Sequence, residues 1–182
     1  MSEHRIRRFR PEDRDGMAAF AQSLPDHDLL FLGRDLKHPR VIEAWLAAIA
    51  EGWIDSMVAD RDGAIVGTAA LVRDPLGWSA HVGEVRLLVS REHRGTGLGR
   101  DLLQAAMAVA GERGLAKLTA AMTSDQIASV ELFETLGFRG EALLKDQVRD
   151  REGRTHDLLV MAHDAARVAA RHRAYGFEAG GS

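Results

Sequence analysis

The sequence contains no cysteine among its 182 residues, which excludes disulfide bonds, thiolate metal ligands and a cysteine nucleophile. Aromatic residues make up only 5% of the chain, and Tyr175 is the single tyrosine. No apolar run approaches the roughly 18 residues of a membrane-spanning helix, and residues 1–15 lack an apolar signal core. Absence of cysteine suits a reducing compartment, so we expect a cytoplasmic protein with no membrane partner.

An excess of one charge is also missing. Lysine and arginine total 24 against 27 aspartate and glutamate, a net charge of −3, so nothing favours a nucleic-acid partner. The 46% hydrophobic and 28% charged residues are typical of a globular domain. Without an internal repeat or a linker, the chain is predicted to form one domain over 1–182, with a core at about 5–163 and a C-terminal helix and loose tail over 164–182.

The most informative stretch is 85–103, which predicts a strand followed by a helix. Val85, Leu87 and Val89 alternate with other residues, as expected for one face of a strand. An apolar stripe at helical spacing then begins at Leu98 and continues to Ala110. Glycines lie between the two elements, where they allow a tight turn and a close approach of the backbone to a ligand.

The junction reads Arg-Gly-Thr-Gly-Leu-Gly over 94–99. It is not a P-loop, because no Gly-Lys-Ser/Thr follows, and its glycine spacing differs from the dinucleotide fingerprint. The first amides of a helix have no internal partner, and the helix dipole makes that end electropositive. The junction therefore predicts a site for a pyrophosphate or similar anion, with an ordinary glycine-rich turn as the alternative.

The rest of the chain alternates strands and helices in an α/β pattern. Helices are expected from Pro11 to Leu24 and around Val41 to Ile49, with an irregular segment between them. An Asp-Gly turn at 62–63 predicts a hairpin. A later helix, capped by Ser124 or Asp125, is expected to face inward with Ile127, Val130, Phe133 and Leu136. Strands are expected over 5–9, 54–59, 64–72, 81–89, 115–122, 139–148 and 155–161, and a short helix over 165–173.

Two motifs make this chain resemble the GNAT superfamily of N-acetyltransferases. The segment 94–99 resembles motif A, Arg-x-x-Gly-x-Gly, and the segment 129–138, SVELFETLGF, resembles motif B. The resemblance covers about residues 5–163. It implies the GNAT fold, a mixed central sheet of about six to seven strands flanked by helices in the order β-α-α-β-β-β-α-β-α-β-β.

The resemblance also implies acetyl-CoA as cosubstrate. In the family the motif A loop holds the pyrophosphate, and the preceding strand runs beside the pantetheine arm. The positions that match in this sequence are Leu87, Leu88, Val89, Arg94, Gly95, Thr96, Gly97, Leu98, Gly99, Arg100, Gln126, Ser129 and Phe133. Arg94 and Arg100 could add charge-assisted bonds to phosphates, or be surface arginines.

Acetyl transfer to an amine needs a neutral amine and a stabilised oxyanion. The matching oxyanion donor is the amide of Val89. Many family members carry a carboxylate on this strand as general base, and Glu84 is the candidate here. The alternative is a strand carboxylate paired with Arg86 or Arg73. His81 is the second candidate base.

Motif B departs from the family pattern at Phe133, where a tyrosine often protonates the leaving thiolate, and Gln126 replaces the usual asparagine. Phenylalanine cannot donate a proton. A free thiol has a pKa of about 8.5, so solvent can protonate the thiolate near neutral pH. Phe133 weakens the assignment of an acid and leaves the acetyltransferase interpretation in place.

We therefore expect direct acetyl transfer to a primary amine, with a small-molecule acceptor favoured over a protein and a homodimer compatible with the sequence. The acceptor side is expected at 24–36, 78–81 and 145–156, where acidic residues would suit a cationic amine. An acyl-CoA-binding sensor without turnover and an acyl-CoA hydrolase are the alternatives. No metal is expected, because the histidines show no HExxH motif or close pairing.

Overall fold

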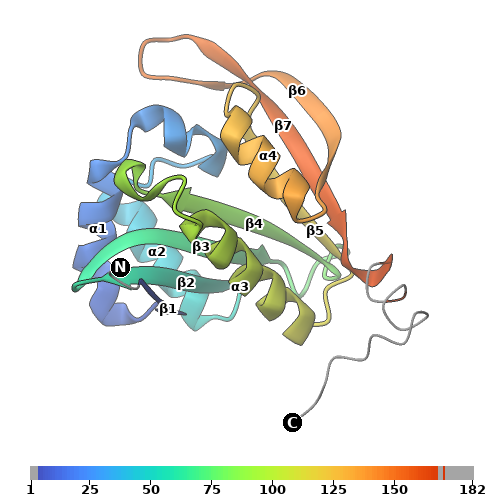
Figure 1. The fold of residues 1–182 in the computed structure, drawn as a ribbon, viewed down its shortest axis with the longest axis horizontal. Helices are drawn as coiled ribbons and strands as arrows, with labels where there is room; N and C mark the ends of the chain where they lie inside the picture. The colour runs from blue at the N-terminus through green and yellow to red at the C-terminus, as the bar shows by residue number, and fades with distance from the viewer. Residues whose placement is uncertain (1–3, 168–169, 171–182) are drawn as a thin grey trace.

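The computed structural model describes residues 4–167 and residue 170, and within them a seven-stranded sheet forms the centre of the molecule (Figure 1). The order across the sheet is β1-β2-β3-β4-β5-β7-β6, and every neighbouring pair is antiparallel except β4 and β5. The strands are β1 (Arg5–Arg8), β2 (Ile54–Arg61), β3 (Ala64–Arg73), β4 (Val82–Val89), β5 (Lys117–Thr123), β6 (Arg139–Arg149) and β7 (Thr155–Asp164).

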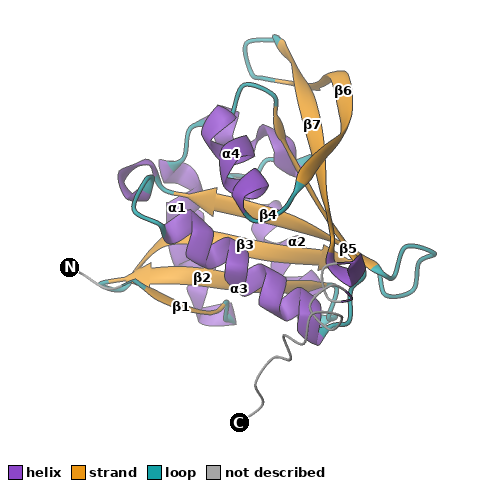
Figure 2. Cartoon of the chain, turned by 45° about the vertical axis from the view of Figure 1, so that its right-hand side comes forward, coloured by secondary structure: helices purple, strands orange, loops and turns teal. Residues whose placement is uncertain are grey.

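Helices cover both faces of this sheet (Figure 2). On one face α3 and α4 enclose a core of aliphatic and aromatic side chains, and on the other α1 and α2 enclose a second core. The α-helices are α1 (Arg14–Ser23), α2 (Pro39–Ala50), α3 (Leu98–Glu112) and α4 (Ile127–Thr135). Short 3-10 helices are η1 (Pro11–Asp13), η2 (Asp26–Leu32) and η3 (Arg91–His93). The mixed α/β sheet with this element order confirms the predicted GNAT fold.

Helix α3 follows directly from its sequence pattern. Leu98, Leu102, Leu103 and Ala106 are fully buried against the sheet, as the helical spacing predicts. Each buried leucine contributes about 1.5–3 kcal/mol of burial free energy, so this one face anchors the helix firmly. Gly114, with a φ of +68°, follows the end of the helix, where glycine accommodates the left-handed conformation that ends it.

Residues with positive φ form the turns at the β2–β3 hairpin and after α4. Asp62 and Gly63 both have positive φ, 52° and 82°, which is the backbone of a tight type I′ hairpin. Gly137, with a φ of +92°, ends α4, and Phe138 packs against Phe133 of the last turn at a ring-centroid distance of 5.0 Å. These junctions hold α4 against the sheet beside α3.

Strands β4 and β5 pair only at one end. Val82 to Glu84 lie opposite Lys117 to Thr119, and beyond these residues the two strands separate. A Cβ on Gly83 would lie 2.6 Å from Leu115 Cδ1 and 2.7 Å from Leu71 Cδ1, so glycine permits the close packing at the joined end. Because β4 continues along β3 and β5 continues along β7, the separation leaves a gap in the middle of the sheet.

A cluster of ion pairs ties the far edge of this sheet to α3. The carboxylate of Asp55, only 5% exposed, accepts hydrogen bonds from Arg113 (2.7 and 3.1 Å), Arg8 (3.1 Å) and Arg73 (3.3 Å). Burial alone would raise the pKa of the Asp55 carboxyl, but the bonds from Arg113 and Arg8 outweigh it and lower that pKa. This cluster could not be predicted from the sequence, because its members come from four separate elements that only the fold brings together.

Several details of the predicted elements were wrong. Ile127 is 60% exposed and does not face inward, and the residue before α4 is Gln126, whose side chain makes no capping bond. The first helix begins with a 3-10 turn, so its α-helical part starts at Arg14. Residues 165–167 are helical, but most of the predicted helix over 165–173 and the tail at 180–182 lie outside the described residues. None of the described helices is long and apolar enough to cross a membrane.

Candidate active site

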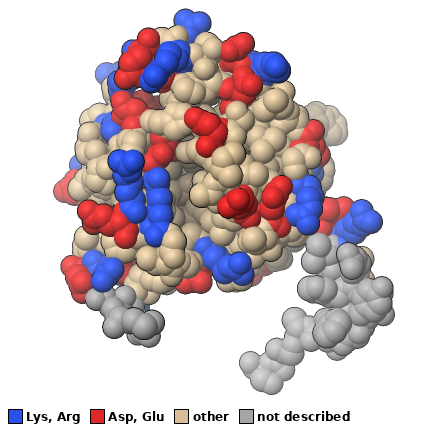
Figure 3. All heavy atoms as spheres, turned by 45° about the horizontal axis from the view of Figure 1, so that its top comes forward, with Lys and Arg blue, Asp and Glu red and all other residues tan. Residues whose placement is uncertain are grey.

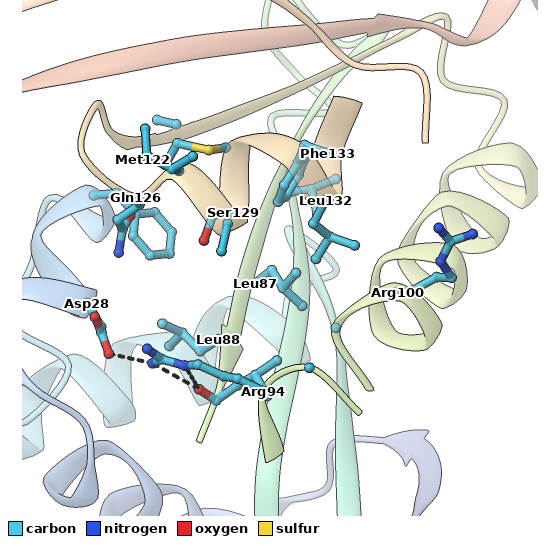
Figure 4. Close-up of a pocket in the computed structure, with 18 of the residues that line it drawn as sticks. Asp28, Leu87, Leu88, Arg94, Arg100, Met122, Gln126, Ser129, Leu132 and Phe133 are labelled. Carbon is cyan, nitrogen blue, oxygen red and sulfur yellow. Dashed lines mark hydrogen bonds and ion pairs between the residues drawn. The ribbon is translucent and has the colours of Figure 1, made fainter. Parts of the chain in front are cut away.

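The gap between β4 and β5 opens into a cavity of about 650 Å³ (Figure 4). Its walls come from six segments, which belong to three separate stretches of the chain. They are η2 (Asp28 and Phe31), β4 (Val85 and 87–89), the glycine loop (Arg94, Gly95 and Gly97), the start of α3 (Gly99 and Arg100), β5 (Ala121 and Met122), and the β5–α4 junction with α4 (125–129, Leu132 and Phe133).

The glycine loop forms one end of this cavity. Within the described residues, the main-chain N–H groups of 95–100 donate no hydrogen bond, and the first helical bond runs from Asp101 N to Gly97 O. Gly97, which precedes the helix, has a φ of +93°, a conformation that favours glycine. Six consecutive free donors at the positive end of a fifteen-residue helix are suited to bind phosphate oxygens.

Close packing of the two helices brings this loop to the cavity. A Cβ on Gly99 would lie 3.0 Å from Leu132 Cδ2 of α4, so a larger residue there would push α3 and α4 apart. At two of the predicted cofactor-binding positions, only the main-chain amide is available to a ligand. The Leu98 side chain is fully buried, and the Thr96 hydroxyl donates to His93 O at 2.7 Å. Neither side chain lines the cavity.

Strand β4 presents a row of amides along the gap. Alternate residues of an antiparallel strand direct their main-chain groups to opposite sides. Ser90 N donates to Val66 O on β3 at 2.9 Å, so the amide of Leu88, two residues earlier, also points toward β3. The amides of Leu87 and Val89 therefore point into the gap. The expectation that Leu88 offers its backbone was therefore wrong, although its side chain lines the cavity. The geometry keeps Val89 N–H available as an oxyanion donor.

Arg94 makes different contacts from those expected of a phosphate ligand. Its guanidinium donates twice to Val89 O, both at 3.2 Å, and to Asp28 Oδ2 at 2.5 Å (Figure 4). It thus joins the end of β4 to η2 across the mouth of the gap. Arg100 is exposed, lines the cavity and forms no ion pair with another described residue, so it remains available to an anion.

On the opposite wall, α4 presents Gln126, Ser129 and Phe133 to the cavity, as expected. Phe133 is 4% exposed, and its ring contacts Phe138 edge to face. No hydroxyl is available at this position, so the wall beside the gap is apolar there. Ser129, half-buried on the first turn of α4, supplies the nearest hydroxyl on this wall (Figure 4).

The two predicted bases do not reach the cavity. Glu84 accepts from Arg86 Nε at 2.9 Å and Nη2 at 3.2 Å, which is the salt-bridged alternative, and it does not line the cavity. His81 is exposed and precedes β4 at the joined end of the gap. Residues 78–81 therefore lie away from the expected acceptor side, and Trp78 is fully solvent-exposed.

The other two acceptor segments do come together. A smaller cavity of about 340 Å³ lies between η2 and the β6–β7 hairpin. Arg151 of the hairpin donates to Asp26 (2.6 Å) and Asp35 (2.8 Å), and Lys37 also pairs with Asp26 (2.7 Å). The acidic residues predicted to attract a cationic amine are thus paired within the chain, and acidic and basic side chains are interspersed over the face in Figure 3.

Sequence reasoning missed one group of side chains beside the large cavity. His27 on η2, Asp125 just before α4 and His156 on β7 converge, although the two nearest in the sequence, Asp125 and His156, are 31 positions apart. Burial tends to raise the pKa of the Asp125 carboxyl, but bonds to Thr123 and His27 lower it overall. No local spacing marks such a group, because its members lie on three different segments.

An open mixed sheet whose two middle strands separate, with helices on both faces, defines an α/β protein. The acetyltransferase (GNAT) family model matches residues 20–138, and the chain belongs to this family, which binds acetyl-CoA.

Three comparisons illustrate the relationship. The chain is 36% identical over 94 residues to a mycothiol acetyltransferase from Thermobispora bispora, a match that covers 48% of this chain and 32% of that relative. Its structure is similar to a ribosomal-protein-alanine N-acetyltransferase from Brucella melitensis, with a TM-score of 0.75, 27% identity, and coverage of 88% and 99% of the two chains. A putative acetyltransferase from Salmonella typhimurium, solved with its cofactor acetyl-CoA, shares the fold at a TM-score of 0.74 and 24% identity, with 90% and 94% coverage.

Proposed function

We propose that this protein transfers the acetyl group of acetyl-CoA to the primary amine of a small molecule by direct attack. The observation that carries the proposal is a set of free main-chain donors in two groups at the cavity. One group is the amides of 95–100, and the other is the amides of Leu87 and Val89 on β4. Such a set matches a ligand with a pyrophosphate at one end and an amide-containing arm behind it.

In this arrangement the amides of 95–100, aided by Arg100, hold the pyrophosphate, and the edge of β4 holds the pantetheine arm. Val89 N–H donates to the oxygen of the thioester carbonyl, where negative charge develops during attack. The contacts of Arg94 with Val89 O and Asp28 keep this end of β4 in place. The protein contributes mainly positioning and a fixed donor, which can supply several kcal/mol of the barrier reduction.

The reaction balances without an acid from the protein. The amine nitrogen bonds to the carbonyl carbon, the carbon–sulfur bond breaks, and the coenzyme A thiolate leaves. The proton lost by the amine passes to solvent, and solvent protonates the thiolate, whose conjugate acid has a pKa of about 8.5. Phe133 on the cavity wall is compatible with this route, because the route does not use a phenol.

The hairpin supports a small acceptor. Arg151 bridges from the β6–β7 turn to Asp26 and Asp35 beside η2, and these contacts narrow the approach to the gap on the acceptor side. A long polypeptide would have to break both ion pairs to lie across this side. A small amine can enter without doing so.

The experiment is to measure thiol release from acetyl-CoA in the presence of small primary amines, amino acids, polyamines and a peptide with an N-terminal alanine. We expect turnover with one or more small amines and none with the peptide. Turnover with the peptide alone would overturn the choice of acceptor. Coenzyme A binding with no turnover on any amine would instead support the sensor interpretation, and thiol release without an acceptor would support hydrolysis.

Replacing Glu84 with glutamine should leave kcat/KM within about threefold of wild type, whereas loss of a general base costs about 10²–10⁴-fold. The reason is that both oxygens of Glu84 accept from Arg86 and neither faces the cavity. Steady-state kinetics with the best amine provides the measurement. A loss of a hundredfold or more would restore Glu84 as the base predicted from the sequence.

A further inference from the structure

Three potential metal ligands meet at the edge of the large cavity. His27 Nε2 lies 3.1 Å from Asp125 Oδ1, and the imidazole of His156 packs edge-on against that of His27 with ring centroids 5.0 Å apart. One ligand atom from each of the three residues lies within 4.8 Å of the other two. Among these residues Asp125 also lines the cavity, so the cluster adjoins the proposed acceptor side.

The distances between these ligand atoms are close to those between the ligands of a bound metal ion. Nitrogen and oxygen ligands of tetrahedral Zn²⁺ lie about 2.0–2.2 Å from the ion, which places them about 3.3 Å from each other. The distance between His27 and Asp125 already matches. The ligand atom of His156 lies within 4.8 Å of the other two, which is at most about 1.5 Å more than this spacing.

A second layer of hydrogen bonds orients His156. Its Nε2 lies 2.9 Å from Asp150 Oδ2, and this bond leaves Nδ1 as the free ring nitrogen. Asp150 is itself held by the amides of Glu152 (3.0 Å) and Arg154 (2.9 Å), and its side chain is only 7% exposed. A carboxylate that fixes the tautomer of a histidine is the usual support of a metal-binding imidazole.

We propose that His27, Asp125 and His156 bind one divalent transition-metal ion, with Zn²⁺ the best match to two imidazoles and a carboxylate. The three ligands leave a fourth position open to water or to a donor atom of the acceptor. Side-chain exposures of 36% for His27 and 60% for Asp125 give the ion a path from solvent. The sequence argued against a metal site because the ligands are distant along the chain, and the fold removes that objection.

The test uses the full chain, freed of metal with a chelator and titrated with Zn²⁺ by isothermal calorimetry. We expect one equivalent to bind with a micromolar or lower Kd, and Mg²⁺, which prefers oxygen ligands, to give no heat. His27→Ala and His156→Ala should each weaken Zn²⁺ binding by at least about thirtyfold, and Asp150→Asn by about tenfold or more. Far-ultraviolet circular dichroism and coenzyme A binding by each variant will show that it is folded.

His4→Ala is the matched control, because His4 pairs with Asp101 at the same 3.1 Å but joins no third ligand among the residues that the structure describes. It should bind Zn²⁺ like wild type. The proposal is overturned if wild type binds no stoichiometric Zn²⁺, or if His27→Ala and His156→Ala bind it as tightly as wild type. Because none of these measurements requires turnover, they stand apart from the test of acetyl transfer.

Discussion

Gly97→Val will weaken coenzyme A binding about a hundredfold, equivalent to about 2.7 kcal/mol. Gly97 holds a φ of +93° immediately before α3, and a β-branched residue is strongly disfavoured in that conformation. Relief of the strain would turn the peptide units of the loop away from the cavity, so the amides of 95–100 would no longer converge. Calorimetric titration with coenzyme A measures the effect.

Gly114→Val provides the control for backbone strain. Gly114 also has a positive φ, +68°, nothing lies within 4 Å of a Cβ built on it, and it follows the opposite end of α3. Gly114→Val should lower the free energy of unfolding by about as much as Gly97→Val does. It should leave the affinity for coenzyme A within about twofold of wild type, because the strain is confined to the opposite end of α3. Equal affinities of Gly97→Val and wild type would remove the glycine loop as the phosphate site and with it the proposed function.

Asp55→Ala will lower the free energy of unfolding by about 3 kcal/mol, the usual cost of removing one partner from a buried ion pair. The carboxylate is 5% exposed and accepts hydrogen bonds from three arginines, of which Arg73 is the most buried. Its loss leaves the Arg73 guanidinium without its carboxylate partner. Urea denaturation measures this change, which corresponds to a fall in Tm of about 6–12 °C for a chain of this length.

Glu141→Ala is the comparison for an exposed pair. Glu141 accepts from Lys117 at 2.6 Å, but both side chains are solvent-exposed, so its removal should cost less than about 1 kcal/mol. A similar small cost for Asp55→Ala would show that the Asp55 cluster is as weak as a surface pair.

The Asp55 cluster also predicts a pH dependence. The arginines lower the folded-state pKa of Asp55 below its unfolded value of about 3.9. The stabilisation is therefore complete above that unfolded value and is lost as the pH falls through the folded pKa. Wild type and Asp55→Ala should differ most near pH 7 and converge toward pH 2, as denaturation at a series of pH values will show.

The elements that local chemistry specifies were predictable from the sequence. The hairpin at Asp62 and Gly63, the stripe of α3 and the strand–glycine–helix junction at 85–103 each depend on residues within a few positions of one another. Their physical causes are a positive φ, a helical period and a dipole, all of which are contained in the segment itself. The family resemblance rested on the same local motifs and was confirmed.

The direction of particular side chains was harder to predict. Glu84 was placed on the correct strand, but the sequence could not show that Arg86, two residues later, would occupy its carboxylate. Arg94 lies in the predicted loop, yet Asp28, sixty-six positions earlier, takes its guanidinium. Arg86 is a neighbour on the same strand, and the sequence left its pairing with Glu84 open as an alternative, whereas the approach of Asp28 to Arg94 depends on the packing of another element.

What the sequence by itself determined is the strand–glycine–helix junction and the class of fold, because consecutive residues encode both. Only the tertiary structure decided which parts of the chain surround that junction. The β4–β5 pairing stops after three residues and β7 lies between β5 and β6, an order that places η2, α4 and β7 around one opening. That placement brings His27, Asp125 and His156 together, since distances between remote residues are fixed by the packing of whole elements and not by their spacing along the chain.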